Sequence, residues 1–249
     1  MKIKEPFSFP NEILYFIITF LDVQSIILVE YTCKLFYQFS KTPEIWENFC
    51  NSLIKPQKIN ISLHSKIVNG SKYEKYLEMY KILRKAYIIK NQEEFVELQN
   101  ITPKYRSFIF LYPGTYTIEN NIRFPPVNII GLGNKKVKIT GGTKQWGILN
   151  FEAKGLYLEH NYMMQYEKCL VTNLKIYAKE NEEIQHIICV GSPFVEIKNC
   201  TLDSKFASAT CLNIFGGDTE CLVINSKIKN SNKHGIYVGQ VLFFLKVGC

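Results

Sequence analysis

The chain has 249 residues, of which 47% are hydrophobic and 21% are charged, and its formal net charge at pH 7 is +8. Length and composition place it among soluble globular proteins with one large or two modest domains. The sequence has no apolar run of membrane-spanning length and no N-terminal signal-peptide pattern, so we expect the protein in the cytosol or nucleus. The many Lys, Ile and Asn residues suggest an AT-rich genome, and a virus-encoded chain would act in the cytoplasm of its host.

The positive charge is concentrated in the middle of the chain. Residues 1–50 carry four basic and six acidic side chains, a net charge of −2, whereas residues 51–107 carry eleven and five, a net charge of +6. Basic surfaces can bind nucleic acid or acidic partners. Here the lysines alternate with glutamates on predicted helix faces, so we interpret them as a solvated surface and expect no nucleic-acid partner.

The eight cysteines lie at apolar positions of the pattern and form no C-x-x-C pair. Together with the expected compartment, this predicts reduced and mostly buried thiols, with structural zinc as a remote alternative. The cysteines are residues 33, 50, 169, 189, 200, 211, 221 and 249.

The first predicted helix starts at Pro10, which suits a first helical position because proline has no N–H to leave unpaired. Ile13, Leu14, Ile17 and Leu21 then form a wide apolar stripe. Phe16, Ile18 and Phe20 lie outside this stripe and are also apolar. A helix that is apolar on most of its surface should be buried or docked on a partner.

Further short helices follow up to Cys50. Asp22 or Ser25 can cap a helix over 26–29, and a further helical turn covers 33–39. Thr42 and Pro43 provide the N-cap and first position of another helix, which contains Trp46. Some forty residues cannot cover this much apolar area by themselves.

Four segments in this region resemble the F-box in order, spacing and residue type. They are residues 9–14 (FPNEIL), 20–22 (FLD), 31–37 (YTCKLFY) and 43–46 (PEIW). Phe9 stands where the family usually has leucine. The resemblance implies docking to the Skp-type adaptor of a cullin-RING ubiquitin ligase, and the alternative is an ordinary helical subdomain. The residues predicted to provide or support the adaptor surface are Phe9, Pro10, Ile13, Leu14, Ile17, Leu21 and Trp46.

The region after the F-box is predicted to be a linker between two domains. Residues 51–70 are irregular and turn-rich, and apolar residues at helical spacing predict an amphipathic helix over 72–87. Asn91 begins a second short helix with a capping-box pattern. We therefore expect an F-box domain at 1–52, a linker with amphipathic helices at 53–106 and a β domain at 107–249.

From Ser107 onward the apolar period changes from about 3.6 to 2, which indicates strands. An internal repeat then appears, because Asn173, Asn199 and Asn225 occupy the same apolar-x-Asn-x-x-apolar frame. A second frame contains Ile188, Leu212 and Ile236. No single unit can bury its own apolar residues, so stacked units with parallel strands are expected.

This repeat predicts a right-handed parallel β-helix, with a β-sandwich as the minor alternative. The repeated asparagine is expected to hydrogen-bond to the next coil at a turn. Residues 110–116 and 127–133 resemble the opening coils of pectin-lyase-like β-helices, and together with the F-box they resemble F-box proteins whose substrate-binding part is such a β-helix. Residues 240–249 do not continue the pattern cleanly, and we expect them to plug an open end or to belong to a truncated solenoid.

Catalysis is not expected from the β-helix. Sugar-cleaving enzymes need clustered carboxylates, but Asp203 and Asp218 lie in different coils, and glutamates 180, 182 and 183 read as a solvent loop. His234 is interpreted as a turn residue. Histidines 64, 160 and 186 lack metal-ligand neighbours, and no nucleotide-binding loop is complete, so we expect no cofactor and no metal.

The sequence favours a non-catalytic, substrate-recruiting subunit of a Skp-cullin-F-box type ubiquitin ligase. In this hypothesis the F-box docks the adaptor and the β-helix binds a target protein. The alternatives are an adaptor-binding scaffold outside any ligase and, less favoured, a carbohydrate-active β-helix enzyme.

Overall fold

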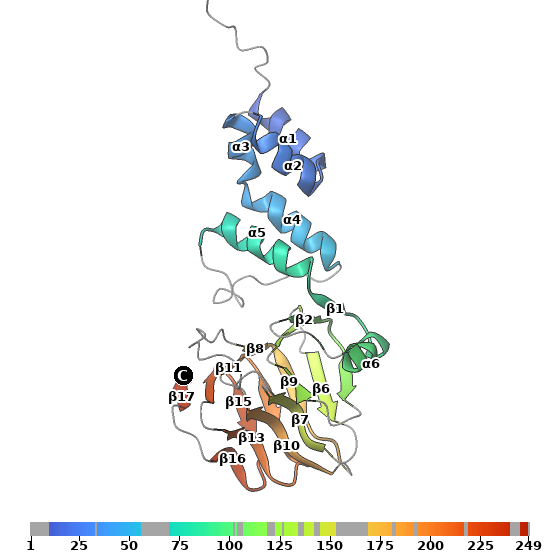
Figure 1. Ribbon diagram of the computed structural model, residues 1–249, viewed down its shortest axis with the longest axis vertical. Coiled ribbons are helices and arrows are strands. Elements are labelled where there is room, and N and C mark those ends of the chain that lie inside the picture. Colours follow the sequence, from blue (N-terminus) through green and yellow to red (C-terminus); the bar gives the residue numbers. More distant parts are fainter. Residues whose placement is uncertain are drawn as a thin grey trace, which may run out of the picture. The chain divides into compact units, whose positions relative to one another are not determined.

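The computed structural model describes two compact units, Met1–Arg84 and Lys85–Cys249 (Figure 1). The described part of the first unit is helical, with α1 Asn11–Phe20, α2 Val23–Glu30, α3 Lys34–Ser40, α4 Pro43–Leu53 and α5 Lys72–Leu83. The residues that the structure describes are 10–32, 34–55, 70–101, 103, 107–118, 123–125, 127–133, 137–141, 145–152, 169–180, 183–191, 194–216, 219–239 and 245–248.

Local capping sets where these helices begin. Asp22 caps α2, because its Oδ1 accepts a hydrogen bond from the backbone N–H of Ser25 at 2.7 Å. Thr42 and Pro43 take the predicted N-cap and first helical positions of α4. Ser71 and Glu74 form a capping box at the start of α5. Pro10 lies one position earlier than predicted, at the N-cap of α1.

The predicted end of the fifth helix was wrong. The pattern placed it at Tyr87, but α5 ends at Leu83, and residues 87–89 form strand β1. Tyr87 pairs with Ile109 of a distant strand, so the pairing across the chain overrides the local helical spacing.

The second unit consists of one helix and stacked strands in its described residues. Helix α6 spans Gln92–Ile101. The strands are β1 Tyr87–Ile89, β2 Phe108–Leu111, β3 Thr115–Ile118, β4 Arg123–Phe124, β5 Asn128–Gly131, β6 Val137–Gly141, β7 Gln145–Glu152, β8 Cys169–Thr172, β9 Leu174–Tyr177, β10 Ile184–Gly191, β11 Phe194–Lys198, β12 Thr201–Asp203, β13 Thr210–Phe215, β14 Glu220–Ile224, β15 Lys227–Lys229, β16 His234–Gly239 and β17 Leu245–Gly248.

These strands form three parallel sheets. Sheet A has the order β1-β2-β5-β8-β11-β14-β17, sheet B the order β15-β12-β9-β6-β3, and sheet C the order β16-β13-β10-β7-β4. Successive coils step in register, as the predicted frame requires, because Ile188 pairs with Leu212 and Leu212 with Ile236. The unit is a parallel β-helix solenoid, which confirms the predicted fold class.

Two strands of sheet A were not expected from the pattern. Strand β1 pairs with β2, twenty residues before the period changes. Strand β17 pairs in parallel with β14, so residues 245–248 continue the sheet where a break in the pattern had been expected. Both strands are short and take their place from their partner strand rather than from their own sequence period.

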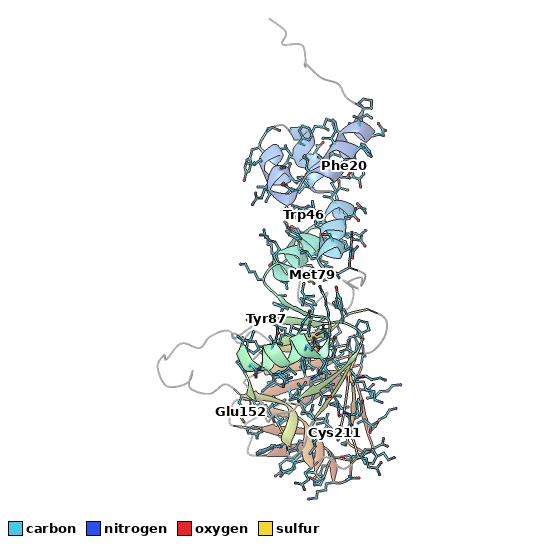
Figure 2. The ribbon with its side chains drawn as sticks, turned by 90° about the vertical axis from the view of Figure 1, so that its right-hand side faces the viewer. Phe20, Trp46, Met79, Tyr87, Glu152 and Cys211 are labelled. Carbon is cyan, nitrogen blue, oxygen red and sulfur yellow. The ribbon has the colours of Figure 1, made fainter. Side chains whose placement is uncertain are left out.

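The core of the β-helix is a column of aliphatic side chains that point inward. In sheet B this column contains Ile139, Ile176 and Leu202, which are fully buried. Cys211, labelled in Figure 2, lies in the same core. The six described cysteines are buried and form no disulfide with one another, as predicted for reduced thiols. Burial raises the pKa of Cys189 and Cys221 to about 12, so these thiols stay protonated at neutral pH.

The repeated asparagines occupy tight turns between sheets A and B. Asn173, Asn199 and Asn225 have φ values of 60°, 53° and 48°, in the left-handed region that asparagine tolerates better than most residues. The side-chain Nδ2 of Asn173 also donates to the carbonyl oxygens of Gly131 and Gly133 at 2.8 and 3.1 Å. The asparagine repeat therefore reflects a backbone conformation at all three positions, and at Asn173 also a side-chain bond to the preceding coil.

Replacing Asn199 with valine should destabilise the β-helix by about 1–2 kcal/mol, because a β-branched residue fits the left-handed conformation poorly. Asn199→Gly serves as the matched control and should change the free energy of unfolding by less than half of that amount. Urea denaturation of the full chain, followed by circular dichroism, measures both values. Equal losses for valine and glycine would show that the conformation of this turn is not what selects asparagine.

Candidate functional site

The helices of the first unit expose an unusual amount of apolar surface. Four of the exposed residues, Ile13, Phe16, Ile17 and Phe20, recur at helical spacing along α1 and therefore share one face of that helix. We call these four residues the α1 stripe. The large apolar side chains exposed in α1–α3 and the turn after α2 are Ile13, Phe16, Ile17, Phe20, Ile27, Leu28, Tyr31, Leu35 and Tyr37.

Helix α1 thus has two apolar faces. Leu14 and Ile18 are buried and hold the helix in the unit. The α1 stripe remains in solvent, with 60% of Phe16 and 71% of Phe20 exposed. The rings of these two phenylalanines pack edge to face, 4.7 Å between centroids (Phe20 is labelled in Figure 2).

The turn after α1 is tightly organised. The backbone N–H of Leu21 donates to the carbonyl of Ile18, and the next residue, Asp22, caps α2. The hydrogen bond from Ser25 lowers the pKa of Asp22 below its ordinary value, so the carboxylate is charged at neutral pH. The F-L-D segment of the sequence therefore fixes where α1 stops and α2 starts.

Burying the α1 stripe would release substantial free energy. A large aliphatic or aromatic side chain contributes about 1.5–3 kcal/mol when it moves fully from water to an apolar contact, before the costs of association. A contiguous apolar surface of this kind on a soluble protein marks an interaction site. The arrangement is suited to docking a protein with an apolar groove.

The structure separates the seven predicted adaptor residues into different environments. Pro10, Ile13 and Ile17 are exposed, and Leu21 is half-buried. Leu14 and Trp46 are buried, 7% and 1% exposed, so they are placed to support the surface rather than to form it. Phe9 lies outside the described residues. Their role in binding stays a prediction.

Trp46 joins α4 to α5. Its Nε1 donates to the carbonyl of Ser40 at 2.7 Å, and its ring packs edge-on against Tyr73 and Tyr80 with centroids 6.2 and 5.8 Å away. The P-E-I-W segment therefore connects the helices after the α1 stripe into one packed group. Figure 2 labels Trp46 together with Met79, a buried residue of α5.

Sequence reasoning placed no surface role on Phe16 or Phe20, or on Ile27, Leu28 and Tyr31. The sequence feature that could have indicated their exposure was the large number of apolar residues around α1. One helix face cannot bury seven apolar residues, so some of them must lie in solvent or at an interface. What the pattern lacked was the packing of α1 on α3, which decides which apolar face is covered.

The described β-helix groups that were considered for catalysis make ordinary structural contacts. Asp203 Oδ1 accepts hydrogen bonds from Asn230 Nδ2 at 2.9 Å and from the backbone N–H of Lys205 at 3.3 Å. His234 is exposed and stacks on Tyr237. Residues 64, 160, 182 and 218 lie outside the described part of the chain.

His186 is buried on the outer side of sheet C. Its Nδ1 lies 2.5 Å from Thr210 Oγ1. Burial, with the nearby Lys233, lowers the pKa of His186 below its ordinary value, so the imidazole is neutral at pH 7. Its surroundings hold a structural hydrogen bond and no paired carboxylate.

Two further properties concern the described residues alone. They contain no group of three or more His, Cys, Asp or Glu residues arranged to hold a metal ion. None of their helices has both the length and the apolar character needed to cross a membrane.

Comparison with protein families identifies a match within the helical unit. Residues 8–52 match the F-box-like family model. Comparisons with curated proteins and with solved structures found no match. The chain therefore combines an F-box-like domain at residues 8–52 with a parallel β-helix.

Proposed function

We propose that this protein is the substrate-recruiting subunit of a Skp-cullin-F-box type ubiquitin ligase. The observation that carries the proposal is the α1 stripe, which is exposed within the segment that matches the F-box-like family model. F-box-like domains bind a Skp-type adaptor, and an exposed apolar helix face suits such docking. Through the adaptor, the chain would join a cullin-RING ligase without contributing a catalytic residue of its own.

In this proposal the parts of the chain have different tasks. The F-box domain, residues 1–52, docks the adaptor, residues 53–106 connect, and the β-helix, residues 107–249, binds the target protein. The resemblance of its opening coils to pectin-lyase-like β-helices supports a solenoid that presents long, flat faces for recognition. The complex would act in the cytoplasm or nucleus, and in the host cytoplasm if the gene is viral.

The test is a double substitution in the α1 stripe. Ile13→Asp with Ile17→Asp places two charges on exposed positions, so the unit should stay folded while the apolar contact is lost. We expect affinity for a purified Skp-type adaptor to fall at least about 30-fold, or roughly 2 kcal/mol, by titration calorimetry. The matched control is Ile101→Asp in α6, because Ile101 is 63% exposed but lies in the second unit.

A buried position separates docking from folding. Leu14→Ala should lower the stability of the helical unit by about 2–5 kcal/mol, because Leu14 is part of the core. A double variant that keeps full adaptor affinity while remaining folded would overturn the proposal. Purified native complexes that contain the adaptor but no cullin would overturn the ligase role and indicate the scaffold alternative.

A further inference from the structure

The outer side of sheet B carries a row of lysines. In register across this sheet, Lys138 of β6 pairs with Lys175 of β9, which pairs with Thr201 of β12, which pairs with Lys227 of β15. Lys229, two residues along β15, lies on the same side. We call Lys138, Lys175, Lys227 and Lys229 the lysine ladder.

The direction of these side chains follows from the strand period. Ile139, Ile176 and Leu202 are fully buried in the interior column, so their neighbours in sequence point outward. Lys138, Lys227 and Lys229 are exposed, and Lys175 is half-buried. The Nζ of Lys175 lies 5.1 Å from the ring centroid of Tyr177, a cation–π contact that holds the ladder's central charge near the sheet.

No carboxylate in the described residues forms an ion pair with the ladder. Asp203 is the acidic residue on the same side of sheet B and pairs in register with Lys229, while its Oδ1 accepts hydrogen bonds from Asn230 Nδ2 and from the backbone N–H of Lys205. Lys138 and Lys175 are direct cross-strand neighbours, about 4.8 Å apart along the solenoid. Like charges placed directly opposite each other destabilise a sheet, so the Lys138–Lys175 pair carries a cost that a bound anion would reduce.

The other two sheets differ on their outer sides. On sheet C the corresponding positions include His186, Thr210 and Asn213, which are neutral and buried. On sheet A they include Phe110 and Ile130, which are apolar and fully buried, and charges of both signs at Glu196, Lys198 and Glu220. Among the described residues, the outer side of sheet B differs by its excess of positive charge, with four lysines against Asp203.

We infer that the lysine ladder binds an extended segment of the target protein that is rich in Asp and Glu. From Lys138 to Lys227 there are three strand spacings, about 14 Å, which an extended peptide covers with four to five residues. Alternate side chains of such a peptide point the same way and lie about 7 Å apart, so its first, third and fifth residues span the row from Lys138 to Lys227. The inference deepens the proposed function by naming the chemistry of the target.

Carboxylates suit this face better than a single phosphoryl group does. The ladder consists of lysines, which are separate, mobile point charges, whereas a phosphate dianion is typically held by the fixed fork of arginine. Charges spread over several coils match charges spread over several residues.

The experiment is a fluorescence-anisotropy titration of the full chain with a labelled twelve-residue peptide of alternating Glu and Ser. The test variant carries Lys138→Gln, Lys175→Gln and Lys227→Gln. The control variant carries Lys85→Gln, Lys90→Gln and Lys233→Gln, which removes the same charge from exposed positions off this face. We expect the test variant to lose at least tenfold in affinity and the control to stay within twofold. Added salt should weaken wild-type binding by screening.

Several results would overturn the inference. They are no binding of the peptide by wild type, equal losses in the two variants, and a phosphoserine peptide of the same charge binding over tenfold tighter than the Glu peptide. A single-stranded oligonucleotide that needs the ladder more than the Glu peptide does would also overturn it. If the triple variant melts early, the single variant Lys175→Gln replaces it, with a two- to threefold loss expected. The titration contains no adaptor, so its result tests peptide binding by the lysine ladder and does not depend on whether the α1 stripe docks an adaptor.

Discussion

Replacing Trp46 with alanine should disrupt the packing of α4 on α5 and lower the free energy of unfolding of the helical unit by about 3–5 kcal/mol. Trp46 is 1% exposed, and its ring touches Phe49, Tyr73 and Tyr80. The substitution removes these contacts and leaves the carbonyl of Ser40 without the indole donor that it has now. A loss of this size is comparable to the whole stability of a small helical unit.

Hydrogen–deuterium exchange measures this prediction unit by unit. Protection should collapse in α4 and α5 of Trp46→Ala, while the strands of sheet A keep theirs. The chain has two tryptophans, and Trp146→Ala is the matched control because Trp146 is 42% exposed. Unchanged protection of α4 and α5 in the Trp46 variant would mean that the indole is not the contact that joins these helices.

The second large effect is expected in the centre of the solenoid. Leu202 is fully buried and pairs in register with Ile176 on one side and Ile228 on the other. Leu202→Ala should lower the free energy of unfolding of the β-helix by about 2–5 kcal/mol, because the rigid coils on both sides cannot close the cavity. In a solenoid each coil contacts only its neighbours, so a central defect weakens two interfaces.

Ile228→Ala tests whether position in the column matters. Ile228 is partly buried and packs against the core from β15. We expect its loss to be less than half of that for Leu202→Ala in urea denaturation followed by far-ultraviolet circular dichroism. Similar losses at both positions would contradict the nearest-neighbour description of this solenoid.

Much of the fold follows from local sequence. Asp22, as an alternative to Ser25, and Asn91 were predicted to cap helices, and the side chain of each does so in the structure. Thr42 takes its predicted N-cap position before Pro43 without a side-chain hydrogen bond. The solenoid was predictable because equivalent positions in successive coils carry the same types of residue. Asn173, Asn199 and Asn225 mark one turn conformation, and Ile188, Leu212 and Ile236 mark one register.

The parts that escaped prediction depend on distant partners. Strand β1 follows a helical pattern without interruption, and only its pairing with β2 makes it a strand. The docking surface shows the same limit, since the sequence treats Leu14 and Ile17 alike while the packing of α1 buries the first and exposes the second. The lysine ladder could not be predicted from the sequence, because Lys138, Lys175 and Lys227 become neighbours only when the coils stack.

Because α1 has one buried and one exposed apolar face, the lifetime of the protein in the cell should depend on whether a partner covers the exposed face. A protein that binds the folded helical unit and not the unfolded one raises the unit's apparent stability, by about 2.7 kcal/mol when its free concentration is one hundred times the Kd. Copies without a partner keep Phe16 and Phe20 in water, where chaperones and proteases recognise such surfaces. We therefore expect surplus copies to be degraded first, so that the abundance of this protein follows the supply of its binding partner in the cell.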